Sequence, residues 1–368
     1  MNPFVFDRPL APDQLIDRAD ELQGLLGLAL GGQSSRLAAP RRYGKTTLLR
    51  ALVASIEEED FVGTLLDFSH VTSLADVIAR FEQGYEEGLD RGSLRALWRT
   101  LRRRLTVEGH VGVPGDVAGV SLSVASADAG GLLTRLHHLL EIPREVHERT
   151  GRECLVVLDE FQDLLSAIDD IDGILRSHIQ HHHGICSYVF AGSEPSLMVE
   201  LFGDRRRPLF GQARAAELGP LPAAALAEWL EERLAGRGRL AERIDELVAF
   251  AGGHPQRAMM LAHFLWEEDP DDPAAFERAR EKAVHEAREG LEQTWAALSA
   301  SERKVLGAIV NGARQTTGRA ALERTGLGKG SAAYATKRLI AEGVARVSLD
   351  GLPSVVDPLL AFWLSARA

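Results

Sequence analysis

Residues 39–46 carry the side chains whose spacing most clearly indicates chemistry. They read Ala-Pro-Arg-Arg-Tyr-Gly-Lys-Thr, which follows the phosphate-binding pattern GxxxxGK[ST] except that Ala39 stands in place of the first glycine. In this pattern, backbone N–H groups at the start of a helix surround the β-phosphate of a nucleotide. Lys45 is expected on the rim of the loop, where it reaches the β- and γ-phosphates, and the Thr46 hydroxyl is expected to ligate Mg²⁺. Because alanine resists positive φ, position 39 either keeps a negative φ or distorts the loop slightly, and a chance Gly-Lys-Thr in a turn is the remaining alternative.

A second motif lies far downstream. Residues 155–158 form an uninterrupted apolar run, which is typical of a strand buried on both faces of a parallel sheet. The run ends in Asp159 and Glu160. In P-loop enzymes an acid at this place holds Mg²⁺ through water, and a second acid beside it can orient and deprotonate the attacking water. The pair favours hydrolysis over binding alone; the alternative is a core strand that happens to meet an acidic turn.

A third candidate is Ser193, which follows another apolar run at residues 188–192. In P-loop enzymes, the strand beside the acidic one presents a polar side chain toward the γ-phosphate. Ser193 is the residue that we expect in this sensing role. A serine that caps the following helix would occupy the same place, and both roles are compatible.

Composition agrees with a cytoplasmic protein of about two or three domains. The chain has 368 residues and a net charge of −11, no uncharged apolar run approaches the ~18 residues needed to span a bilayer, and the first residues lack a signal-peptide layout. The last 73 residues carry ten Lys or Arg and five Asp or Glu, a balance of +5, which leaves −16 on the first 295 residues. A basic end on an acidic body weakly indicates an anionic partner for that end.

The order of the expected elements indicates the architecture. Strands and helices alternate over residues 1–221, which predicts a three-layer α/β core with a parallel sheet and, at residues 111–126, an inserted β-hairpin. Residues 222–295 are expected to form a helical lid. Residues 296–368 suggest a winged helix-turn-helix: three short helices, then two strands around an Asp350-Gly351 turn.

Three smaller features have plain interpretations. The run His181 to His183 is best explained as cationic histidines at a helix C-terminus, with metal binding as the alternative. The basic cluster between Arg95 and Arg104 suits a solvated helix face, with an anionic contact as the alternative. Cys154 and Cys186 begin two apolar strands, so we expect buried free thiols.

Taken together, these motifs resemble the archaeal-type ATPases, within the AAA+/STAND division of P-loop NTPases, over the whole chain. The resemblance also extends to origin-recognition initiators, which join an AAA+ core to a winged helix. It is carried by the order and spacing of eight segments: Asn2-Pro-Phe, Ile16-Asp-Arg-Ala-Asp-Glu-Leu, Pro40-Arg-Arg-Tyr-Gly-Lys-Thr, Leu158-Asp-Glu-Phe-Gln, Ala191-Gly-Ser, Pro208-Leu-Phe-Gly, Gly253-His-Pro and Asp357-Pro-Leu-Leu-Ala-Phe-Trp-Leu.

The resemblance implies a site for ATP and Mg²⁺ made of several parts. Ile16 and Arg18 would flank the adenine, and Pro255 would touch the nucleotide from the lid. Family members often carry an arginine directly after Pro-Leu-Phe-Gly, where this chain has Gln212. An arginine acting on the γ-phosphate, in cis or in trans, would then be Arg214 or one of residues 205–207. The loop residues implied to wrap the phosphates are Pro40, Arg41, Arg42, Tyr43, Gly44, Lys45, Thr46 and Thr47.

Two functional hypotheses from different classes follow. In the first, an ATP-hydrolysing switch binds DNA through its winged helix. In the second, a signalling ATPase uses the winged helix as an internal packing or protein-binding module, with no DNA contact. A homo-oligomer or a protein partner, and no membrane, is expected in general. Tyr334, Lys337 and Arg338 suit phosphate contacts, as does Arg346 near the wing, but the small residues around them offer little for base edges. A simple GTPase is disfavoured, because the sequence has no Asn-Lys-x-Asp motif.

Overall fold

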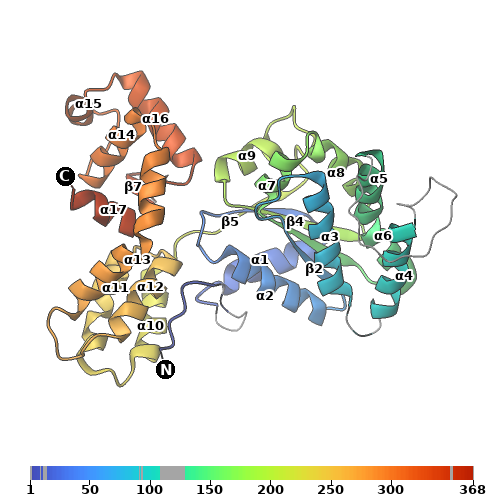
Figure 1. Cartoon of the computed structure of the whole chain (residues 1–368), viewed down its shortest axis with the longest axis horizontal. Coiled ribbons are helices and arrows are strands. Elements are labelled where there is room, and N and C mark those ends of the chain that lie inside the picture. Colours follow the sequence, from blue (N-terminus) through green and yellow to red (C-terminus); the bar gives the residue numbers. More distant parts are fainter. Residues whose placement is uncertain are drawn as a thin grey trace, which may run out of the picture.

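The computed structural model describes residues 2–8, 10, 15–90, 92, 94–107, 129–348 and 351–367. Figure 1 shows an α/β core on one side and two stacked helical units on the other, with the end of the chain in the upper unit. The hairpin expected at residues 111–126 lies outside the described residues, and so does Asp350 of the expected turn. No helix in the described ranges combines the length and the apolar character needed to cross a bilayer.

The core is built on one sheet of parallel strands in the order β2-β3-β4-β1-β5. Every residue of β3 and β4 is buried, which confirms the expectation drawn from their apolar runs. Because the strands are parallel, all of their carboxyl ends meet at one edge of the sheet. The strand bounds are β1 Ser35–Ala38, β2 Val62–Asp67, β3 Cys154–Asp159, β4 Cys186–Gly192 and β5 Arg214–Glu217.

Helices cover both faces of the sheet, as expected for a three-layer core. Successive side chains of β3 point to opposite faces: Leu155 and Val157 pack with α1 and α2, whereas Val156 and Leu158 belong to the cluster on the other face. The helices of the first face are α1 Ala19–Leu30 and α2 Lys45–Glu58. Those grouped with the second are α3 Leu74–Leu89, α4 Leu94–Val107, α5 Ala129–Leu140, α6 Ile142–Thr150, α7 Phe161–Ala167, α8 Ile171–Ile179 and α9 Pro195–Gly203.

The remaining elements form the lid and the C-terminal unit. The lid holds α10 Ala223–Leu234, α11 Ile244–Ala251, α12 Pro255–Trp266 and α13 Ala275–Ala297, with a short 3₁₀ helix at Gly238–Arg243. The C-terminal unit holds α14 Ala300–Val310, α15 Arg319–Thr325, α16 Lys329–Ala341, an antiparallel hairpin of β6 Ala345–Val347 and β7 Pro353–Val355, and α17 Pro358–Ser365. Three helices followed by a hairpin is the winged-helix order. One hydrophobic cluster runs through both units, so the winged helix is packed on the lid.

The first described residues of the chain lie against the lid, whose helices are distant from them in the sequence. The Phe4 ring contacts those of Trp229 and Trp266, with ring centroids 5.8 and 6.0 Å apart. The His263 side chain is hydrogen-bonded to the Phe4 carbonyl at 2.8 Å. This docking places residues 5–8 where they form one wall of a cleft between the lid and the core.

Candidate functional site

A cleft of about 830 Å³ opens at the carboxyl edge of the sheet. Its walls come from four parts of the chain: the N-terminal segment, the loop after β1, the residues that follow β2 and β3, and the lid helices α12 and α13. The size suits a ligand of nucleotide dimensions. Residues lining the cleft include Phe6, Ile16, Arg41, Arg42, Gly44, Lys45, Thr46, Thr47, His70, Glu160, Asp163, Pro255, Gln256, Met259 and Glu286.

The loop after β1 turns into α2 through two residues with positive φ. Gly44 has φ 83° and immediately precedes the helix, and Arg42 has φ 69°. Ala39 is not among the described residues with positive φ. Of the two possibilities at this position, the first therefore applies: alanine keeps a negative φ, and the tight part of the turn lies further along. The Ala39 N–H donates to the Gly192 carbonyl at 3.2 Å, which fixes the start of the loop beside the end of β4.

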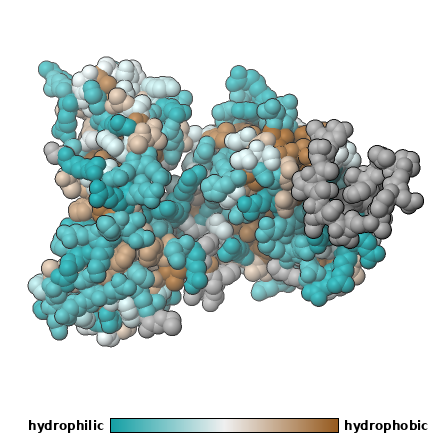
Figure 2. All heavy atoms as spheres, viewed as in Figure 1, coloured by the Kyte–Doolittle hydropathy of each residue, from teal (hydrophilic) through white to brown (hydrophobic). Residues whose placement is uncertain are grey.

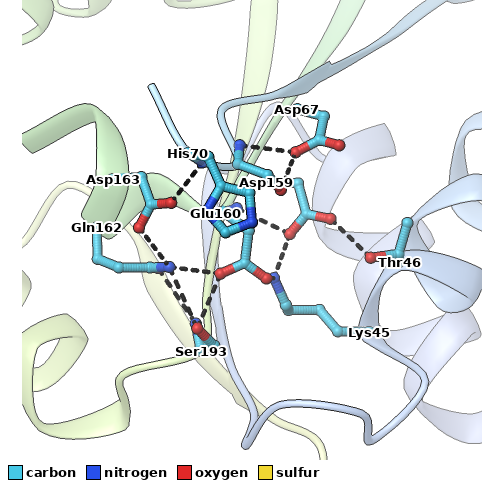
Figure 3. Close-up of polar contacts among 10 residues, drawn as sticks. Lys45, Thr46, Asp67, His70, Asp159, Glu160, Gln162, Asp163 and Ser193 are labelled. Atoms are coloured by element: carbon cyan, nitrogen blue, oxygen red, sulfur yellow. Dashed lines mark hydrogen bonds and ion pairs between the residues drawn. The ribbon is translucent and has the colours of Figure 1, made fainter. Parts of the chain in front are cut away.

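Lys45 holds together the charged centre of the cleft (Figure 3). Its ammonium forms ion pairs with Asp159 and, at 2.6 Å, with Glu160. The Thr46 hydroxyl donates to the second Asp159 oxygen at 2.9 Å. Lys45 is only 5% exposed, so the expectation that it lies on the rim of the loop is wrong. The two carboxylates draw the side chain inward.

Ser193 joins this centre through its side chain. Its hydroxyl donates to Glu160 at 2.8 Å, and its backbone N–H donates to the Gln162 side chain at 3.2 Å. The following helix begins after Glu194 without a side-chain cap, so Ser193 does not cap it. Gln162 also donates to Glu160. Sequence reasoning missed Gln162, although its place two residues after Glu160 is the available signal.

The two acids of the centre have opposite pKa shifts. Burial raises the pKa of Asp159, and the neighbouring Lys45 ammonium offsets this effect only in part. Burial would also raise the pKa of Glu160, but Lys45 and the hydrogen bonds from Gln162 and Ser193 outweigh it, so the pKa lies below its ordinary value. Glu160 is therefore ionised at neutral pH.

His70 is a further polar residue at the cleft that sequence reasoning missed. It follows β2, has a φ of 60°, and its backbone N–H donates to Asp163 at 2.8 Å. Both His70 and Glu160 line the cleft. A non-glycine residue at positive φ is uncommon, costs about 1–3 kcal/mol, and belongs to a class of conformations that cluster at functional sites. The sequence carries no signal for this conformation beyond the end of an apolar run.

The oxygen donors at the centre suit Mg²⁺. No group of three or more His, Cys, Asp or Glu side chains within the described ranges is arranged to hold a metal by itself. Thr46 and Asp159 instead place a hydroxyl and a carboxylate side by side. Mg²⁺ typically takes one or two protein oxygens and completes its shell with water and phosphate oxygens.

Other predicted site residues are placed differently. Ile16, Thr47 and Pro255 line the cleft. Arg18 is buried and is bonded to Glu21 at 2.7 Å and to the Gly219 carbonyl at 2.6 Å, so it joins α1 to the segment after β5. Pro40 is not among the residues lining the cleft.

Arg214 is not among the residues that line the cleft. It pairs with Ser35 at the start of β1, whereas the loop follows the end of β1. Residues 205–207 lie in the segment between α9 and β5, which leads into the same amino edge. There Arg206 and Arg207 form ion pairs with Asp204 and Glu200.

Tyr43 extends the loop toward the other two units. Its ring lies 5.0 Å from that of His254, at the start of α12. Its hydroxyl accepts a hydrogen bond from Arg346 of β6 at 3.1 Å, and Arg346 also donates to the Gly252 carbonyl at 3.3 Å. Val356, after the hairpin, is buried in the same hydrophobic cluster as Tyr43. The loop thus contacts the lid and the winged helix at one place.

A buried ion pair lies beside this contact. Arg257 of α12 donates to both carboxylate oxygens of Asp357, at 3.0 and 2.5 Å. Burial would raise the pKa of Asp357, but Arg257 outweighs it, and the pKa is lowered. Burial and the charge of Arg257 lower the pKa of Arg42, which places this loop residue close to the pair.

Comparisons with known proteins identify the fold. A scan against family models and a search of curated proteins found no match. Among solved structures, the Walker-type ATPase paby2304 of Pyrococcus abyssi is similar, with a TM-score of 0.69 and 18% identity over 98% of this chain and 99% of that chain. The ORC2 protein of Aeropyrum pernix, in ADPNP-ADP complexes, has a TM-score of 0.58 and 16% identity over 98% and 97%. The ORC1 protein of Aeropyrum pernix, in complex with DNA, has a TM-score of 0.51 and 17% identity over 97% and 94%.

The chain therefore has the fold of AAA+ P-loop ATPases, with a parallel core, a helical lid and a C-terminal winged helix. The matches to the Walker-type ATPase and the two ORC proteins extend over nearly the whole of each chain, so they include all three parts. The resemblance to archaeal-type ATPases is confirmed at the level of the fold.

Proposed function

We propose that this chain binds and hydrolyses Mg-ATP and couples its nucleotide state to its winged helix. The loop, the acidic pair and Ser193 converge on one cleft of suitable size. The similar ORC2 structure was solved in ADPNP-ADP complexes, and the similar paby2304 protein is a Walker-type ATPase. In this proposal the working units are the core of residues 1–221, the lid of residues 222–295 and the winged helix-turn-helix domain of residues 296–368.

The chemistry follows from the partners of Lys45. When ATP binds, its phosphates compete with Asp159 and Glu160 for the ammonium. When the Lys45 ammonium turns from Glu160 to the phosphates, the largest influence that lowers the pKa of Glu160 is removed. The Glu160 carboxylate then becomes a better base. A water oxygen then attacks the γ-phosphorus and its proton passes to Glu160, while the bond to the bridging oxygen breaks with its electron pair on ADP. Thr46 and Asp159 would hold Mg²⁺, which neutralises phosphate charge.

The other end of the cleft suits the base. Ile16 and Phe6 offer apolar surface from the N-terminal segment, and Pro255 and Met259 face the cleft from the lid. A flat adenine fits between such surfaces, because stacking and apolar contact need no charged partner. In this arrangement the position of the lid depends directly on the bound nucleotide.

One observation carries the coupling: the phosphate-binding loop touches the winged helix without an intermediary. The Tyr43 hydroxyl and the Arg346 guanidinium are 3.1 Å apart, although 303 residues separate them in the sequence. Gly44 and Lys45, which follow Tyr43, are the residues that must adapt when phosphates enter. A change in the loop therefore reaches β6 through one hydrogen bond and the Tyr43 ring.

The substitution Tyr43→Phe tests this coupling, because it removes the hydroxyl and keeps the ring against His254. We expect wild-type ATP turnover in the variant. In wild type, we expect ATP to change the amide hydrogen exchange of residues 344–348, and in Tyr43→Phe this nucleotide response is expected to be lost. Tyr334→Phe is the matched control, since Tyr334 on α16 is 68% exposed. The proposal would be contradicted if ATP left the amide hydrogen exchange of residues 344–348 unchanged in wild type.

The partner of the winged helix is the second question. DNA association is proposed from the basic charge of this unit and from the similar ORC1 protein, which was solved in complex with DNA. The placement of the cations favours the alternative, a protein-interaction module. Arg346 is turned inward to Tyr43, Arg338 is paired with Glu342, and α16 lies against α9 of the core.

A direct experiment separates these two candidates. ATPase rate and particle size are measured with and without duplex DNA at several salt concentrations. Phosphate contacts release counterions, so DNA affinity would fall steeply as salt rises. Binding of this kind, weakened by Lys337→Ala for all sequences alike, supports DNA association. Absence of salt-dependent DNA binding in both nucleotide states supports the protein-interaction module.

A further inference from the structure

The cleft needs a cation for the γ-phosphate besides Lys45. Phosphoryl transfer spreads negative charge over the γ-phosphate oxygens, and an arginine there increases turnover by about 10³–10⁵-fold in P-loop NTPases. Arg214 and residues 205–207 lie toward the opposite edge of the sheet. The arginines that do line the cleft are Arg8, Arg41 and Arg42.

These three arginines have different surroundings. Arg8 belongs to the N-terminal segment, where Phe6 contacts the rings of His263 and Phe264, so it lies toward the lid. Arg42 is influenced by Arg257 and Asp357 at the junction with the winged helix. Arg41 is exposed to the cleft and has no hydrogen bond or ion pair with any described residue. It is a solvated cation on the wall of the cleft.

The path of the loop gives Arg41 its position. Ala39 is hydrogen-bonded to Gly192, and Gly192 precedes Ser193, which is bonded to Glu160. The first half of the loop therefore borders the side of the cleft where Ser193 and Glu160 lie. Arg41 follows Ala39 by two residues, before the chain turns away at Arg42.

We propose that Arg41 binds the terminal phosphate of bound ATP and acts on it in cis. This inference rests on the proposed ATPase function. The planar guanidinium can pair with two phosphate oxygens at once, which the ammonium of Lys45 cannot do. Arg41 changes no bond in the reaction: it stabilises the charge on the γ-phosphate oxygens while Glu160 takes the proton from water. The chain then needs no arginine from a second copy.

The test compares Arg41→Ala with Arg42→Ala, its exposed neighbour in the same loop, and with Arg214→Ala. We expect Arg41→Ala to slow single-turnover ATP hydrolysis by at least about 10²-fold. We also expect the variant to bind a non-hydrolysable ATP analogue more weakly and to bind ADP with unchanged affinity. Arg41→Lys is expected to recover little of the rate, because lysine lacks the two-pronged geometry. Arg214→Ala is expected to hydrolyse at the wild-type rate, and Arg42→Ala, which also lines the cleft, is expected to lose less of the rate than Arg41→Ala. Thermal melting checks that all variants are folded.

A mixing experiment distinguishes action in cis from action in trans. Arg41→Ala is mixed with Glu160→Gln, so that each lacks one partner of the reaction. If Arg41 acts in cis, the mixture stays as slow as the separate variants. Recovery in the mixture, wild-type hydrolysis by Arg41→Ala, or a larger loss in Arg42→Ala would overturn the inference.

Failure of the proposed function has a different signature. If wild type binds ATP without hydrolysing it, the ATPase proposal fails. The binding of the terminal phosphate by Arg41 is then still tested by the ratio of the affinity for the ATP analogue to the affinity for ADP. An Arg41→Ala ratio equal to that of wild type would then reject the inference as well.

Discussion

Both edges of the central sheet carry polar side chains, but the surroundings of these side chains differ. At the carboxyl edge, Asp159, Glu160 and Ser193 bond to one another and to Lys45 beside an open cleft. At the amino edge, the Cys154 thiol donates to the Pro143 carbonyl at 3.6 Å, and His182 is hydrogen-bonded to the Tyr188 hydroxyl at 2.6 Å. The first set has partners that a ligand can replace. The second is closed off by the protein.

Burial changes the chemistry of the amino edge accordingly. It raises the pKa of Cys154 to about 12, so the thiolate needed for nucleophilic or metal chemistry is absent at neutral pH. Figure 2 shows that hydrophilic residues cover much of this face of the core and of the helical units, with apolar patches among them. Charged residues such as Lys45 and Glu160 line the cleft. Polar side chains at strand ends thus indicate a site only where they lie beside an accessible cleft and where a ligand can replace their hydrogen-bond partners.

Strain separates the edges as well. Arg42, His70 and Glu160 all have positive φ, and all three line the cleft. Each such conformation costs about 1–3 kcal/mol and persists only where the surrounding structure enforces it. The other described non-glycine residues with positive φ are Asp17, Asp60 and Asp170, which are not among the residues lining the cleft and are of a type that tolerates this region more easily.

Lys45→Ala should produce the largest effect on the carboxyl edge. It removes the phosphate contact, so nucleotide affinity and turnover should be lost. It also leaves Asp159 buried without its cation, which should lower the free energy of unfolding at pH 7 by about 3–5 kcal/mol. Nucleotide titration and chemical unfolding measure the two effects, with the exposed Lys337→Ala as the control. A folded variant with unchanged ATP affinity and turnover would remove Lys45 from the site.

Glu160→Gln should act on turnover alone. Glutamine keeps the shape of the side chain and removes the base, so hydrolysis should slow by about 10²–10⁴-fold while Mg-ATP binds as in wild type. Glu153→Gln is the matched control, because Glu153 directly precedes the same strand at the amino edge. Steady-state turnover and equilibrium binding give the answer. Normal turnover in Glu160→Gln, with Asp159→Asn also benign, would mean that the acidic strand end is not catalytic.

Much of the carboxyl edge could be predicted because its signals are local. The loop pattern, the apolar runs of β3 and β4 and the acids that end β3 are each contained in a few consecutive residues. The position of Arg214 was also within reach, because the first residue of a parallel strand lies at the amino edge. The contact of Tyr43 with Arg346 was not, since it depends on how the lid and winged helix pack on the core.

The run of three histidines shows the same limit within a few residues. The sequence suggests three cations at a helix C-terminus, and this is wrong for His182. Its side chain is fully buried, its ring stacks on Tyr188, and burial lowers its pKa to about 4. His181 and His183 on either side are exposed. Periodicity cannot tell which of three identical neighbours turns inward.

His182 therefore gives the amino edge a pH dependence that affects stability and leaves turnover alone. Its pKa is about 4 when folded and about 6.5 when unfolded. Between these values the unfolded chain binds the extra proton, so stability is lost as pH falls. From pH 7 to pH 5 the contribution of His182 to the free energy of unfolding should fall by about 2 kcal/mol. Chemical unfolding at both pH values should show this part of the acid sensitivity removed in His182→Asn and retained in His181→Asn, its exposed neighbour. Equal sensitivity in the two variants would mean that His182 is protonated in the folded protein and that the amino edge is open to water.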